Sequence, residues 1–130
     1  NMRLGDPETQ VIMALLESNL LDVFTDCLDG KDLDLRFSDK KAVCLVMTSG
    51  GYPGNYEIGY EITGLDKVKE SEVLFAGAEI HQGKVVTSGG RVLNIVATGD
   101  TYQEARKKVY QDALTLRFDY AYYREDIGDF

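Results

Sequence analysis

The sequence predicts an α+β fold with a mostly antiparallel sheet, and the order of its elements supports this class. Two helical patterns open the chain, several short apolar runs separated by glycine-rich turns follow, and a further helical pattern precedes the C-terminal tail. Strands joined by short turns pair antiparallel, because a parallel pair needs a long crossover connection. The 130 residues suffice for a domain with a buried core.

The first two helices are predicted from capping residues and apolar spacing. Asp6 and Pro7 stand where an N-cap and a first helical residue are expected, and the apolar run 11–16 continues the helix. Asn19 offers the N-cap of a second helix and Gly30 its C-terminal stop. We expect the apolar residues of the second helix to pack in the core. They are Leu20, Leu21, Val23, Phe24, Cys27 and Leu28.

A polar segment, residues 31–41, separates these helices from a β-rich remainder. It contains one short alternating piece, residues 33–37, which suggests a strand. The sequence therefore predicts two units, residues 1–30 and residues 31–130.

Short apolar runs predict the strands of the second unit. The continuous run 42–47 predicts a buried strand that ends in the glycine- and proline-rich segment 49–54. Such a segment can cradle a phosphate, but this one lacks the spacing of a phosphate-binding loop, and a structural turn is favoured. Further strands are predicted at 73–78, at 92–97, and in a hairpin over 79–86 that turns at Gln82-Gly83.

The third helix begins at Thr101, because Thr101 and Glu104 have capping-box spacing, and it is predicted to run to about Leu116. Its predicted buried stripe is Ala105, Val109, Ala113 and Leu116, and its predicted solvated face is Arg106, Lys107 and Lys108. The aromatic and charged tail, residues 118–128, has groups that stack on a nucleobase. An amphipathic edge packed on the sheet is the favoured interpretation in an acidic chain.

Composition limits the kinds of partner. The 22 acidic residues outnumber 14 Lys and Arg, and the net charge of −8 argues against nucleic acid or an anionic membrane as the main partner. No apolar run reaches the length of a membrane span and no signal peptide is visible. Cys27 and Cys44 are predicted to be reduced, buried thiols, as expected of a cytoplasmic protein, and His81, beside the hairpin turn, is predicted to be exposed.

Residues 1–10 carry the densest set of functional groups. Asn1, Arg3, Asp6 and Glu8 place an amide, a guanidinium and two carboxylates within eight residues. A well-capped helix start would explain them without any chemistry. However, the sequence Arg-Leu-Gly-Asp-Pro-Glu-Thr-Gln-Val at 3–11 resembles the signature of the phosphoribosylamine–glycine ligases (glycinamide ribonucleotide synthetases), ATP-grasp enzymes of purine synthesis.

The resemblance covers nearly the whole chain. The Ser-Gly-Gly-Tyr-Pro-Gly segment at 49–54, the segment 59–64 and the tail at 122–128 are similar to family segments, whereas Phe75 stands where the family has histidine. The resemblance implies that the chain is the C-terminal piece of a larger enzyme. Residues 1–30 would end an ATP-grasp domain, and residues 31–130 would form a small, mostly antiparallel barrel-sandwich domain.

The resemblance also implies a chemistry. The complete ligase uses ATP to phosphorylate glycine, and the amine of 5-phosphoribosylamine attacks the glycyl phosphate, giving glycinamide ribonucleotide, ADP and phosphate. Asn1 matches the family's metal-binding asparagine for Mg²⁺ or Mn²⁺, whose carboxylate partner would precede this chain. Arg3 matches a catalytic arginine that would face the transferred phosphoryl group. Asp6 and Glu8 would lie near glycine and the amine, with helix capping as the competing explanation.

Lys84 and Arg91 are candidates for binding the substrate's phosphate. They flank a segment that ends in Gly89-Gly90, where backbone N–H groups and a guanidinium can meet one anion. A related ATP-grasp enzyme, the formate-dependent transformylase, binds its substrate's phosphate with a similarly spaced Lys and Arg. We therefore expect Lys84, Gly89, Gly90 and Arg91 to hold the 5-phosphate of phosphoribosylamine, although ordinary surface cations would look the same.

Two other function classes stay open from the sequence. One is a ligand-binding module that keeps the fold without chemistry, and the other is an interaction module of a multifunctional purine-synthesis protein. The chain alone is expected to be inactive, because it lacks the lysines, the glycine-rich lid and the acidic metal ligand of an ATP-grasp site.

Overall fold

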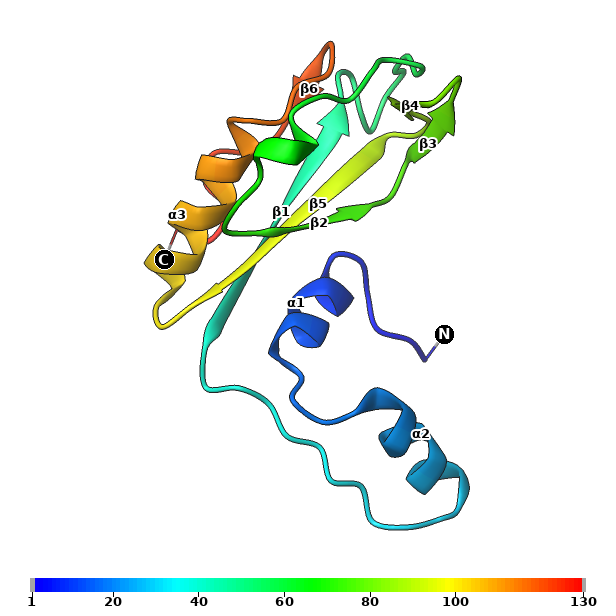
Figure 1. The fold of residues 1–130 in the computed structure, drawn as a ribbon, viewed down its shortest axis with the longest axis vertical. Coiled ribbons are helices and arrows are strands. Elements are labelled where there is room, and N and C mark those ends of the chain that lie inside the picture. Colours follow the sequence, from blue (N-terminus) through cyan, green and yellow to red (C-terminus); the bar gives the residue numbers. More distant parts are fainter. Residues whose placement is uncertain (1, 130) are drawn as a thin grey trace.

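The computed structural model describes residues 2–129 and confirms the α+β class (Figure 1). A short 3-10 helix at Leu65–Lys67 joins the longer elements. These are α1 (Glu8–Leu15), α2 (Leu20–Leu28), β1 (Lys41–Ser49), β2 (Glu72–Phe75), β3 (Ala78–His81), β4 (Lys84–Thr87), β5 (Arg91–Gly99), α3 (Tyr102–Ala113) and β6 (Ala121–Tyr122). The longest helix in this part of the chain has 12 residues, and none there is long and apolar enough to cross a bilayer.

The strands form a four-stranded sheet and a separate hairpin. The order in the sheet is β2-β5-β1-β6, β3 pairs with β4, and every pair is antiparallel, as predicted. The two long strands pair from Lys41 opposite Gly99 to Met47 opposite Leu93, and the register shifts between Met47 and Thr48. The hairpin turns at Gln82 and Gly83, whose φ angles of 50° and 78° fit a two-residue turn.

The core lies between the sheet and α3. Alternate residues of β1 point toward α3, so the predicted buried strand is fully buried on one face only, and Cys44 and Val46 are half-buried on the other. Helix α1 contacts β1 and β5, and Figure 1 shows it on the opposite side of the sheet from α3. The buried residues of the core are Val43, Leu45, Met47, Ile62, Val92, Leu93, Ile95, Ala97, Ala105, Val109, Ala113, Leu116 and Phe118.

The predicted burial of α2 is wrong. Asn19 caps the helix as predicted, since its Oδ1 accepts from Leu21 N at 2.9 Å, and Gly30 follows the helix with a φ of 68°. Within α2, however, only Val23 is buried. Figure 1 shows α2 projecting away from the sheet, so the described residues do not cover its apolar side. The side chains that are exposed against prediction are Leu20, Leu21, Phe24, Cys27 and Leu28.

The predicted strand at 33–37 is also absent. Leu33 and Leu35 are exposed, and the segment makes one isolated bridge, between Phe37 and Leu16. Ser18 Oγ instead fixes this segment, since it donates to Asp34 O and accepts from Arg36 N, both at 2.7 Å. Glu17 N also donates to Arg36 O at 2.9 Å and Ser38 N to Leu15 O at 2.8 Å, so the segment pairs with residues 15–17 over one bridge only, too short for a strand.

The predicted strand at 73–78 is divided between β2 and β3, because the chain bends at Gly77. Gly77 N donates to Arg91 O at 2.7 Å, and Gly77 O accepts from Ser88 N at 2.7 Å. A Cβ on Gly77 would lie 2.6 Å from Gly89 Cα. Two glycine backbones therefore touch where β2 passes to the hairpin.

Helix α3 begins as predicted and ends earlier. Thr101 Oγ1 accepts from Glu104 N at 3.1 Å, while the Glu104 carboxylate accepts from Asp100 N at 2.8 Å. The predicted solvated face is only partly solvated. Lys107 is exposed, but Arg106 donates to Glu125 O at 2.6 Å and to Ile127 O at 3.1 Å. These hydrogen bonds hold the C-terminal segment on α3. Lys108 donates to Thr98 O in β5 at 2.9 Å.

Asp112 is a buried carboxylate at the end of α3, with 4% of its surface exposed. Its two oxygens accept from Lys69 N at 3.1 Å and from Glu70 N at 2.9 Å. Burial acts to raise the pKa of Asp112, but the hydrogen bonds from these backbone groups outweigh it and leave the pKa below its usual value.

We expect Asp112→Asn to lower the free energy of unfolding by about 1–3 kcal/mol at pH 7, because one buried acceptor becomes a donor facing backbone N–H groups. The pKa is lower in the folded state, so the carboxylate stabilises the fold fully above its unfolded pKa and less as pH falls through the folded pKa. Urea denaturation of both proteins should show a difference that shrinks below about pH 4. A difference independent of pH would contradict this account.

Candidate functional site

Two loops and the N-terminal peptide meet at one end of the sheet, beside Gly90. The loop after β1 carries Tyr52 and Tyr56, whose rings cover Gly90. A Cβ added to Gly90 would lie 2.2 Å from Tyr52 Cδ2. Ser49 N donates to Gly90 O at 2.8 Å, and Ser49 Oγ donates to Gly89 O at 2.9 Å. Close packing thus requires both glycines, and their role in binding an anion stays a prediction.

Arg91 joins the N-terminal peptide to the sheet. Its Nη2 lies 3.0 Å from Asp6 Oδ2, and its Nη1 donates to Asp6 O at 2.8 Å. The second oxygen of Asp6 accepts from Gln10 Nε2 at 2.7 Å. Pro7 is the N-cap of α1, and no side chain caps this helix. The prediction that Asp6 caps α1 is therefore wrong, because its carboxylate turns toward the guanidinium of Arg91.

Of the remaining candidates of the N-terminal peptide, the structure describes Arg3 and Glu8. Arg3 is exposed, and Asn1 lies outside the described residues. Glu8 is the first residue of α1, and its carboxylate covers Gly5, where an added Cβ would lie 2.1 Å from Glu8 Oε2.

Lys84 and Arg91 do not contact the same residues. Its Nζ is 2.6 Å from Glu61 Oε2, and both side chains are exposed. Lys84 and Arg91 thus have different carboxylate partners, and Lys84 does not line the cavity beside Arg91.

A cavity of about 300 Å³ lies between the start of α1, β1 and the C-terminal segment, and we call it the arginine cavity. Arg91 and Arg124 both line it. Burial, reinforced by the Asp6 carboxylate, raises the pKa of the Cys44 thiol to about 12, so this lining thiol stays protonated at neutral pH. The other lining residues are Pro7, Val46, Thr48, Tyr52, Tyr122, Tyr123 and Ile127.

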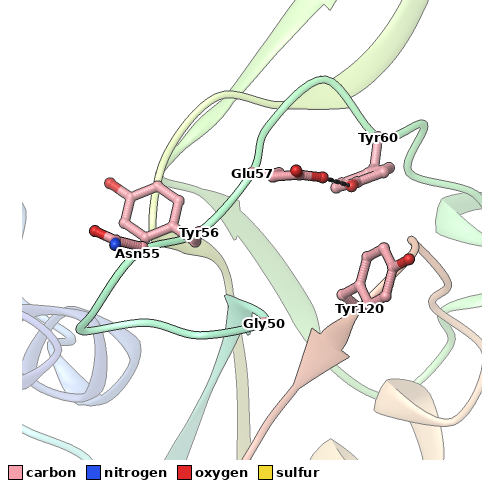
Figure 2. A pocket seen from close by; sticks show the side chains of 6 residues that line it. All are labelled: Gly50, Asn55, Tyr56, Glu57, Tyr60 and Tyr120. Carbon is pink, nitrogen blue, oxygen red and sulfur yellow. Dashed lines mark hydrogen bonds between the residues drawn. The ribbon is translucent and has the colours of Figure 1, made fainter.

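A second cavity, of about 440 Å³, lies beside Gly50, and Figure 2 shows tyrosine rings and a carboxylate around it. Tyr60 OH donates to Glu57 Oε2 at 2.5 Å, and this hydrogen bond is the main reason that the pKa of Tyr60 rises to about 12. The Tyr120 ring meets the Tyr60 ring edge-on at 5.5 Å. Asn55 and Tyr56 complete the lining, which contains no cation, so it suits a phosphate less well than the arginine cavity does.

The described residues do not form a metal site of their own. Among residues 2–129 no group of three or more His, Cys, Asp or Glu side chains is placed to hold an ion.

Comparison with known families tests the resemblance seen in the sequence. The family model described as "Phosphoribosylglycinamide synthetase, C domain" matches residues 42–130, from β1 to the tail. The chain belongs to this family. The match confirms the family resemblance inferred from the sequence.

Relatives of the family extend the match to the N-terminal helices. The phosphoribosylamine–glycine ligase of Caldanaerobacter subterraneus subsp. tengcongensis is 50% identical over 98% of this chain, and a bifunctional purine biosynthetic protein of Schizosaccharomyces pombe is 42% identical over 98%. The crystal structure of the Thermotoga maritima ligase is 38% identical and superposes with a TM-score of 0.86 over 97% of the chain. The chain spans 31% of the first relative, 17% of the second and 32% of the third.

Two of the residues that line these cavities were not selected from the sequence. Arg124 lies in the Tyr-Tyr-Arg tail that resembles the family, and Tyr52 lies in the glycine- and proline-rich segment. Both segments were visible as motifs, but nothing in the sequence indicates that they face Arg91 across one cavity.

Proposed function

We propose that this chain is the C-terminal part of a phosphoribosylamine–glycine ligase. The complete enzyme would use ATP to form glycyl phosphate, and the amine of 5-phosphoribosylamine would displace phosphate to give glycinamide ribonucleotide. The observation that carries this proposal is the 50% identity to such a ligase over 98% of the chain. The substrates glycine, 5-phosphoribosylamine and ATP, and a cytoplasmic location, follow from the same proposal.

The division into two units is part of the proposal. Residues 1–30 would complete an ATP-grasp domain and residues 31–130 would form the barrel-sandwich domain. A family model that starts at residue 42 supports the second unit. The two units share an interface, because α1 contacts β1 and β5 and Asp6 pairs with Arg91.

The roles of individual residues are proposed on the same basis. Arg3 would face the transferred phosphoryl group, Asp6 and Glu8 would lie near glycine and the amine, and Asn1 would bind Mg²⁺ or Mn²⁺ together with ligands beyond this chain. Of the proposed phosphate clamp, Arg91 has the stronger structural support, because it lines a cavity next to the N-terminal peptide.

The chain by itself is expected to release no phosphate from ATP in the presence of glycine and phosphoribosylamine. Residues 2–129 offer no metal cluster, and a neutral amide at Asn1 is too little for a divalent cation. A coupled phosphate assay on the purified chain, beside the complete ligase as positive control, checks this. Release that depends on both substrates from the chain alone would falsify the prediction.

An interaction module of a multifunctional protein is the second candidate, and the match to the bifunctional Schizosaccharomyces pombe protein favours it. The complete protein separates the two candidates. If it forms glycinamide ribonucleotide and Arg3→Ala abolishes this, the ligase assignment holds. If the Arg3→Ala protein keeps normal turnover, the N-terminal peptide has no catalytic role.

A further inference from the structure

Arg124 is presented to the arginine cavity from a fixed segment of backbone. Tyr110 OH donates to Arg124 O at 2.7 Å and accepts from Ile127 N at 3.1 Å. The contacts of Arg106 with the carbonyls of Glu125 and Ile127 hold the same segment on α3. Because the backbone is held, less conformational freedom is lost when Arg124 binds a ligand than would be lost on a mobile loop.

Both arginines of the cavity keep donors for a further acceptor. A guanidinium has five N–H groups in a planar fork. Arg124 uses Nε and Nη2 for the two oxygens of Asp126, at 2.8 Å and 2.5 Å, and Arg91 uses Nη1 and Nη2 for Asp6. Within residues 2–129 the remaining N–H groups have no other acceptor, so they are available to an anion, and each carboxylate balances the charge of its arginine.

We propose that Arg124 and Arg91 together bind the phosphate monoester of the sugar-phosphate substrate in the arginine cavity, with the sugar against Tyr52 and Pro7. This inference rests on the proposed function, because that reaction needs a substrate phosphate that is held and not transferred. In a chain of net charge −8, a phosphate requires local cations, and this cavity supplies two arginines, each of which also pairs with a carboxylate. Arginine forks match phosphate oxygens bidentately.

From the sequence, Lys84 was expected to bind the phosphate together with Arg91. In this proposal Arg124 has that role instead of Lys84. Lys84 is paired with Glu61 and is absent from the lining of the cavity, whereas Arg124 shares the lining with Arg91. Residues 91 and 124 are far apart in sequence, so only the fold brings them to one cavity.

The test is binding of ribose 5-phosphate to the complete protein by isothermal titration, because this probe carries the phosphate and the sugar without the unstable amine. Arg124→Gln is expected to weaken binding about tenfold or more, since a charge-assisted contact is lost. In steady-state assays the same variant should raise the KM for phosphoribosylamine by a similar factor and leave the KM values for ATP and glycine nearly unchanged. Arg124→Lys, which keeps the charge but not the fork, should lie between the two proteins.

Two control variants separate binding from a structural role. Arg117→Gln removes an arginine whose side chain donates to Leu116 O and does not line the cavity, so the affinity for ribose 5-phosphate should not change. Asp126→Asn breaks the ion pair of Arg124 but keeps the guanidinium, so the affinity should stay equal or increase.

Unchanged affinity and unchanged KM in Arg124→Gln would overturn the inference, and so would an equal loss of affinity in Asp126→Asn. The titration does not require turnover, so it also tests phosphate binding by Arg124 if the complete protein makes no glycinamide ribonucleotide. That last result would overturn the proposed function, and loss of ribose 5-phosphate affinity in Arg124→Gln would still support the site.

Discussion

Arg91→Ala in the complete ligase is expected to raise the KM for phosphoribosylamine about tenfold to a hundredfold, while the KM values for ATP and glycine stay nearly unchanged. The reason is local. Arg91 is a cation that lines the arginine cavity. It also contacts the N-terminal peptide, through the carboxylate and the carbonyl of Asp6. In the proposed site, removing it would take away a bidentate donor for the phosphate of phosphoribosylamine, and glycine and ATP would not contact this position.

Two variants show whether the effect comes from phosphate binding. Asp6→Asn weakens the ion pair to Arg91 but keeps the guanidinium of Arg91. A decrease in melting temperature shared by Asp6→Asn and Arg91→Ala therefore measures the contribution of the ion pair to stability.

Lys84→Ala tests the other half of the proposed clamp. A rise in the KM for phosphoribosylamine comparable to that of Arg91→Ala would support Lys84 as a ligand, and an unchanged value would assign Lys84 to the exposed pair with Glu61.

Gly64→Ala is expected to have the largest effect on stability, lowering the free energy of unfolding by about 3 kcal/mol or more. Gly64 has a φ of 84°, which disfavours any side chain. An added Cβ would also lie 2.0 Å from Thr115 O. The two segments cannot easily move apart, because Thr63 N donates to Arg117 O at 2.8 Å and Arg117 N donates to Thr63 O at 3.0 Å.

Gly83→Ala is the matched control for this substitution. Gly83 has a similar φ of 78°, but no atom lies within 4 Å of the position of an added Cβ. The control therefore measures the backbone conformation alone, about 1 kcal/mol. Urea denaturation of the three proteins gives the difference. Equal losses in the two variants would show that the clash with Thr115 is relieved by small movements.

Local physics made most of the fold predictable. The cap at Thr101 and the hairpin turn at Gln82 and Gly83 depend on residues within a few positions, and the structure confirms both. The predictions for α2 and for residues 33–37 were wrong for a common reason. A periodic pattern shows which side of an element is apolar, but it does not show whether anything covers or pairs with that side.

The candidate site was predictable in part. Arg91 and Asp6 were selected separately, from a cation beside two glycines and from a helix start, and the structure joins them in one ion pair. Capping explained Asp6 equally well from the sequence, because its true partner lies in β5. Arg124 was missed for the same reason, since its position beside Arg91 depends on how the tail packs on β1 and α3.

The pairing of β1 with β5 also governs how quickly the chain can fold. Residues 50–90 separate the two strands, whereas two residues close the hairpin of β3 and β4. A hairpin forms within about 1–10 μs, but bringing distant strands together costs more loop-closure entropy. We therefore expect the hairpin to form early, and the core between the sheet and α3 to form only once β1 and β5 meet. We expect that long-range encounter to limit the refolding rate.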